Sequence, residues 1–96
     1  MGDREGESRH LEEAVRANPR FARGYLFLAK AILDRAGDLE EAIRLARKGL
    51  DLEPDSASAP LGHYILADIY DRLGRTSEYL AELEKGRTLE AAAKKR

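Results

Sequence analysis

A short sequence motif occurs twice in this chain of 96 residues. Residues 24–37 read GYLFLAKAILDRAG, and residues 62–74 read GHYILADIYDRLG. The copies lie about 38 residues apart, a period at which supersecondary units repeat in stacked-repeat proteins. In such a protein each unit buries its apolar face against its neighbours. The repeat therefore predicts a stack of similar units, and proteins built in this way usually work by presenting a surface.

Apolar residues recur at helical spacing through most of the chain, and nothing in the pattern indicates a strand. The expected inward stripes are Tyr25, Leu28, Ala29, Ile32 and Leu33; Leu39, Ala42, Ile43, Ala46, Gly49 and Leu50; His63, Leu66, Ala67 and Tyr70; and Tyr79, Leu80, Leu83, Gly86 and Leu89. A shorter helix is expected over residues 11–17. Five helices joined by short turns must pack antiparallel, which predicts an all-α fold.

Glycine, proline and aspartate mark the expected helix ends. Gly37 should end the first long helix in the left-handed conformation, which glycine adopts most easily. Asp38 can then cap the next helix with its side chain. Pro54 should stop that helix, and Pro60 suits the first turn of the third. Gly74 should end the third helix, in the same role as Gly37.

The composition bounds the classes of function. Charged residues make up 36% of the chain, yet the formal net charge is only -1, which argues against binding to a nucleic-acid backbone. The chain has no cysteine, hence no disulfide or thiolate metal site, and no apolar run long enough to span a membrane. The absence of a signal-peptide pattern and of cysteine slightly favours a cytoplasmic location, and no cofactor is expected.

The first full copy resembles the tetratricopeptide repeat, a helix–turn–helix unit of about 34 residues. Tyr25, Leu28, Ala29 and Ile32 stand at the signature positions of its first helix, the segment 37–43 matches the turn and second-helix opening, and Gly49 and Pro54 complete the unit. The second copy carries Leu66, Ala67, Tyr70, Gly74, Gly86 and Leu89. It departs from the family at His63, where an aromatic residue is usual, and at Tyr79, where the family has alanine.

The resemblance implies a short right-handed superhelical α-solenoid. Residues 1–9 would be a flexible leader, residues 10–19 the tail of an earlier unit, residues 20–56 the first repeat and residues 59–93 the second, with a polar capping helix to residue 96. Because the chain starts midway through a unit, we expect it to be the C-terminal part of a larger protein.

In this family the first helices of successive units line a concave groove that binds segments of partner proteins. By position, the groove residues would be Arg23, Leu26, Phe27, Lys30, Asp34, Leu61, Tyr64, Asp68 and Arg72, with Ile65 beside Phe27 on the shoulder. Leu26, Leu61 and Tyr64 would form an apolar floor, and Lys30 could pair with Asp68. The alternative is an ordinary solvated surface, since every such repeat has a concave face.

Catalytic and metal-binding interpretations are weaker. Asp34, Asp68 and Asp71 are expected to be solvated charges, because no loop gathers the oxygen ligands that a cation needs. His63 is expected to fill the aromatic slot of the core, since no nucleophile or second titratable group has a matching spacing. The sequence therefore favours a non-enzymatic module that binds a protein or peptide. The alternative is an oligomerisation domain that self-associates through its open N-terminal end.

Overall fold

The computed structural model describes residues 3–94, with side chains from Ser8 onward. Within this range the chain forms five helices and no strand, which confirms the all-α class. The helices are α1 (Asp3–Ala17), α2 (Ala22–Asp34), α3 (Leu39–Leu52), α4 (Ala59–Arg72) and α5 (Thr76–Lys94). None of the helices in the described part of the chain is long and apolar enough to cross a membrane.

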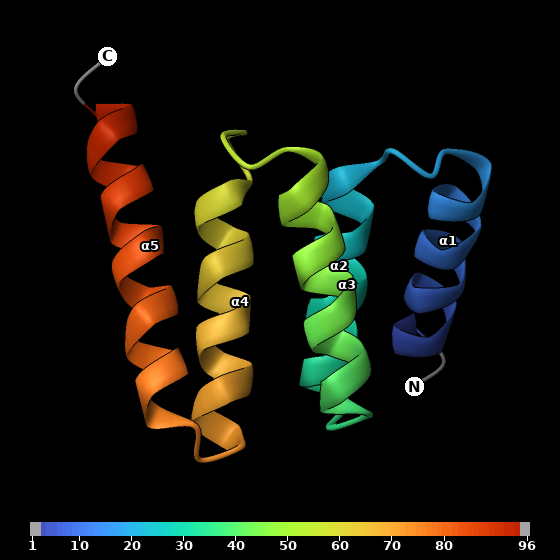
Figure 1. Ribbon diagram of the computed structural model, residues 1–96. Helices are drawn as coiled ribbons and strands as arrows, with labels where there is room; N and C mark the ends of the chain where they lie inside the picture. Colours follow the sequence, from blue (N-terminus) through green and yellow to red (C-terminus); the bar gives the residue numbers. More distant parts are fainter. Residues whose placement is uncertain (1–2, 95–96) are drawn as a thin grey trace.

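Successive helices run in opposite directions and lie side by side (Figure 1). The closest packing joins α2 to α3 and α4 to α5, so the chain is built from two helical hairpins. The second hairpin is attached through α4, which contacts both helices of the first, and α1 packs on α2. The described residues measure 38 × 31 × 21 Å along their principal axes, so each helix lies near the surface.

The expected caps of the middle helices are present. The Asp38 carboxylate accepts hydrogen bonds from the backbone N–H groups of Glu40 at 3.1 Å and Glu41 at 3.2 Å. These donors have no partner inside the helix, so the aspartate satisfies them at the start of α3. Pro60 lies in the first turn of α4, where its missing N–H costs nothing.

The prediction for Gly37 is wrong by one residue. Ala36 adopts the left-handed conformation, with φ of 54°, whereas in the second unit Gly74 adopts it, with φ of 74°. The Gly37 N–H donates to the Ile32 carbonyl at 2.9 Å, and the Arg75 N–H donates likewise to Tyr70 at 2.8 Å. The two helices therefore end in the same way, and the extra residue of the first unit places alanine where the second has glycine.

This difference predicts opposite effects of two substitutions. Ala36→Gly should stabilise the protein by about 0.5–1 kcal/mol, because relief of left-handed strain outweighs the entropy that glycine loses on folding. Gly74→Ala should destabilise it by about 1 kcal/mol, although a Cβ at Gly74 would meet no atom within 4 Å. Urea unfolding of both variants measures these changes. Equal effects of the same sign would contradict the assignment.

The first helix is longer than expected. It begins at Asp3, so most of the segment predicted to be a flexible leader is helical, and the helix extends well before residue 11. Ser8 is 4% exposed, and the Arg35 guanidinium donates a hydrogen bond to its hydroxyl at 3.2 Å. This contact with the end of α2 fixes α1 at a point that apolar periodicity does not mark. Residues 1–2 of the expected leader, and Lys95 and Arg96 of the expected cap, lie outside the described residues.

Small residues occupy the points where helices approach most closely. Ala29, Ala42, Ala46 and Ala59 have no exposed surface. The first three were predicted to face inward; Ala59 was not among the predicted inward residues. The α5 stripe is only partly correct, because Leu80 is 56% exposed. Leu80 stands at the position equivalent to Ile43, which joins the buried core that includes α4 residues. Within the described residues no helix follows α5, so Leu80 has no corresponding neighbour.

Candidate functional site

The start of α4 and the end of α5 enclose a groove of about 800 Å³. We call it the α4–α5 groove; it is lined by Asp55, Ser56, Ala57, Pro60, Leu61, Tyr64, Leu89, Glu90, Ala92, Ala93 and Lys94. It forms because α5 has 19 residues and α4 only 14, so the end of α5 extends past the start of α4. Its lining is mainly apolar, and it also includes the acidic residues Asp55 and Glu90 and the basic residue Lys94.

Tyr64 is the aromatic residue of the lining. A Cβ built on Gly86 would stand 2.7 Å from its ring, so the glycine lets the tyrosine ring approach α5 closely. The Tyr64 hydroxyl donates a hydrogen bond to the Glu90 carboxylate. This hydrogen bond raises the pKa of Tyr64 above its ordinary value of 10.0, with a smaller opposing effect from Arg87. The phenol is therefore engaged as a donor to a side chain of α5.

Only part of the predicted groove comes together. Leu61 and Tyr64 both line the α4–α5 groove. Arg23 lies close to its edge, since its Nε donates a hydrogen bond to the Ser58 hydroxyl at 3.2 Å. Phe27 is 37% exposed on α2, in agreement with a place on an accessible shoulder.

Leu26 does not belong to an accessible surface. It is 1% exposed, and a Cβ on Gly49 or on Gly62 would approach its side chain to 3.0 Å or less. Leu26 is therefore enclosed between α3 and α4, and the prediction that it forms the groove floor is wrong. Ile65 is 4% exposed and belongs to the same core, so it is not a shoulder residue either.

The charged residues farther along α2 and α4 pair within their own helices. Lys30 Nζ lies 3.1 Å from an Asp34 oxygen, and Arg72 Nε lies 3.6 Å from an Asp68 oxygen. The expected pairing of Lys30 with Asp68 is therefore wrong, because each has a partner one helical turn away. Arg72 also donates to the Leu33 carbonyl at 3.0 Å, which joins the ends of α4 and α2.

Sequence reasoning missed the contribution of α5 to the groove. Ala92 and Ala93 line it, although the end of α5 was expected to act as a polar cap, and Leu89, which was expected to face inward, lines it as well. The length of the last helical pattern is the signal that could have found them. A helix longer than its hairpin partner must leave part of its inner face uncovered.

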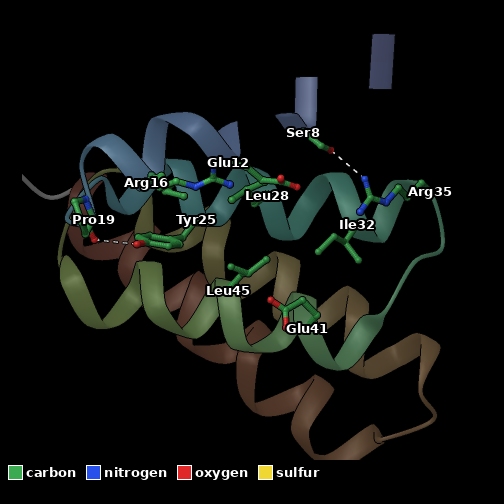
Figure 2. A pocket seen from close by; sticks show the side chains of 11 residues that line it. Ser8, Glu12, Arg16, Pro19, Tyr25, Leu28, Ile32, Arg35, Glu41 and Leu45 are labelled. Carbon is green, nitrogen blue, oxygen red and sulfur yellow. Dashed lines mark hydrogen bonds between the residues drawn. The ribbon is translucent and has the colours of Figure 1, made fainter. Parts of the chain in front are cut away.

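A second hollow of about 600 Å³ lies over α2, between α1 and α3 (Figure 2). Tyr25, Leu28 and Ile32 form its floor, and Figure 2 shows charged side chains around its edge. At the position equivalent to Ile32 the second unit has Tyr70, whose ring is covered by the guanidinium groups of Arg47 and Arg75. The shorter side chain accounts for the hollow as a packing difference between the units.

One buried polar pair joins α4 to α5. His63 Nδ1 lies 2.8 Å from a Glu82 carboxylate oxygen, and the Glu82 side chain is 5% exposed. Lys85 Nζ approaches the other oxygen at 3.5 Å. His63 is thus an inward residue, as expected, but with a polar partner that the sequence analysis did not find. In the part of the chain that the structure describes, no three His, Cys, Asp or Glu side chains gather closely enough to hold a metal ion.

The likeness of the two units can be followed residue by residue. Leu26 lies against Gly49 in the first unit, and Tyr64 lies against Gly86 in the second. Leu26 is enclosed by the next helix, whereas Tyr64 faces the open groove.

Searches of protein-family models, curated proteins and solved structures find no match to the chain, so the resemblance to tetratricopeptide repeats stays a prediction drawn from its own residues.

Proposed function

We propose that this chain is a non-catalytic protein-interaction module of tetratricopeptide-like repeats, and that its α4–α5 groove binds a segment of a partner protein. The packing of the helices supports the repeat architecture. Because α4 contacts both α2 and α3, the second hairpin stacks on the first as a whole unit does in a helical solenoid. The contact of α1 with α2 fits the tail of an earlier unit.

One observation carries the proposal: Tyr64 and Leu26 are equivalent, but only Leu26 is covered. The surface around Leu26 is covered by the turn before α4, where Ser58 accepts from Arg23, and by the first residues of α4, where Gly62 lies against Leu26. The corresponding surface around Tyr64 is the α4–α5 groove. A concave apolar surface with a few fixed polar groups is the usual form of a binding site.

Photo-crosslinking from inside the groove tests this function. A photoreactive amino acid at Leu61 should form adducts with a partner in cells that produce the protein, and Tyr64→Ala should reduce them. The same group at Leu73 is the control, since Leu73 is 38% exposed just beyond the other end of α4. Equal labelling from both positions would contradict the proposal. Adducts of the chain with itself alone would show that a second copy, and not a partner protein, occupies the groove.

A further inference from the structure

Two helices of this protein dock on a preceding helix in the same way. A Cβ on Gly24 of α2 would stand 2.7 Å from a Val15 methyl group on α1. A Cβ on Gly62 of α4 would stand 2.8 Å from a Leu50 methyl group on α3. In each case a glycine lets the new helix lie directly on an apolar side chain of the helix before it.

The next position in this series is on α5. Leu50 and Gly49 of α3 correspond to Arg87 and Gly86 of α5, about 37 residues later, a period typical of stacked helical units. Leu26 corresponds in the same way to Tyr64. The surface at Arg87 and Tyr64 therefore has the arrangement on which α4 docks, with one exposed guanidinium in place of a buried leucine.

The polar contacts of α4 indicate what a helix on this surface must carry. The Arg47 guanidinium donates to the Tyr70 hydroxyl, and Tyr70 lies about two helical turns after Gly62. The counterpart of Arg47 on α5 is Glu84, which is exposed. A glutamate carboxylate can accept hydrogen bonds, whereas the arginine at the equivalent position donates one. Arg72 of α4 donates to the backbone carbonyl of Leu33, and the counterpart of Leu33 is Asp71, an exposed residue that adds a carboxylate beside the equivalent carbonyl. Glu84 and Asp71 thus place two carboxylates where the second half of a docked helix would lie.

We propose that the α4–α5 groove and the adjoining face of α5 bind an amphipathic helix of a partner protein, antiparallel to α5. The helix carries glycine or alanine over Tyr64 and Arg87, and a basic side chain about two turns later opposite Glu84. Its first turn lies near Glu90, whose negative charge suits a helix N-terminus. This inference rests on the proposed function and adds the conformation, direction and charge of the bound segment.

The probe is a synthetic peptide with the sequence of residues 56–74 and the substitution Tyr70→Lys, labelled with a fluorophore. Fluorescence anisotropy should show that it binds the full chain. The Gly62→Leu form of the peptide should bind at least tenfold more weakly, because leucine cannot approach Tyr64 and Arg87 closely. The chain variant Tyr64→Ala should lose affinity to a similar extent.

A charge exchange tests the register. Glu84→Lys in the chain should weaken binding of the lysine peptide about fivefold to tenfold, and a peptide with Tyr70→Glu should restore it. Glu13→Lys is the matched control, since this exposed residue of α1 makes the same change in net charge and should have little effect. Equal losses in both chain variants, or equal binding of the Gly62→Leu peptide, would overturn the inference.

The same experiments distinguish an error in the inferred helical partner from an error in the proposed binding function of the groove. If Leu61 forms crosslinks with a partner but no helical probe depends on Gly62 or Glu84, the groove binds a segment in another conformation. If Leu61 forms none, the groove is not a binding site at all. Sedimentation of the chain at several concentrations identifies a third outcome, in which a second copy occupies the groove and the partner helix is excluded.

Discussion

His63→Phe is expected to destabilise the protein by about 2–4 kcal/mol, the largest effect we expect from any single substitution. The reason is the carboxylate of Glu82, which is 4% exposed and accepts from His63 at 2.8 Å. Phenylalanine keeps an aromatic ring but has no donor, so Glu82 would keep only Lys85 at 3.5 Å. Urea unfolding gives the change in the free energy of unfolding.

The double variant His63→Phe/Glu82→Leu should recover most of this loss. In the first unit the equivalent positions hold Tyr25 and Leu45, so an aromatic–aliphatic pair suits the same place in the hairpin. Replacement of a buried polar pair by well-packed apolar residues is often neutral or stabilising. Losses that simply add in the double variant would show that the two side chains do not interact.

An exposed ion pair is the matched control for this experiment. Lys30 and Asp34 form a pair in which the side chains are 49% and 47% exposed. Asp34→Ala should therefore cost less than about 1 kcal/mol, because solvent screens the charges. A loss as large as that of His63→Phe would show that burial is not the reason for the difference.

Gly49→Ala is expected to cost about 1–3 kcal/mol, although alanine forms helices better than glycine. An added Cβ would stand 2.8 Å from the carbonyl oxygen of Ala22 and 2.9 Å from Leu26. The carbonyl belongs to the backbone of α2, so only a shift of α2 against α3 could relieve the clash. The loss of stability should be seen in thermal and urea unfolding.

Gly86→Ala tests the same substitution at the equivalent place in the second unit. The three atoms nearest to the added Cβ all belong to the ring of Tyr64, the first at 2.7 Å, and this ring borders the open groove. A side chain at a groove can turn away more easily than a backbone can move. Gly86→Ala should therefore destabilise the protein less than Gly49→Ala, and the reverse order would contradict the account of the two helix crossings.

The sequence predicted the elements whose causes are local. Apolar periodicity and the cap at Asp38 located the middle helices, and the start of α5 at Thr76 was correct. These features depend on residues within one or two helical turns of each other, so they can be predicted without knowing which other helices pack nearby. The left-handed residue at Ala36 was missed because glycine is the usual choice at a helix end, and the extra residue shifted its role.

The candidate site was predictable only in part, for reasons that depend on packing between units. Leu61 and Tyr64 line a groove, although it lies between α4 and α5 and not along the first helices of both units, whereas Leu26, at the position equivalent to Tyr64, is buried by α4. The two residues have the same local pattern, so periodicity cannot distinguish them. What differs is whether another helix lies on top.

The amino-acid sequence alone therefore determined that the chain is helical, where most helices begin and end, and that two of its hairpins are equivalent. The tertiary structure decided which copy of an equivalent position is covered, that α1 extends to Asp3, and that Glu82 joins His63 beneath the surface. The physical reason is one of range. Helix formation is governed by neighbours along the chain, whereas burial depends on contacts between residues that the sequence holds far apart.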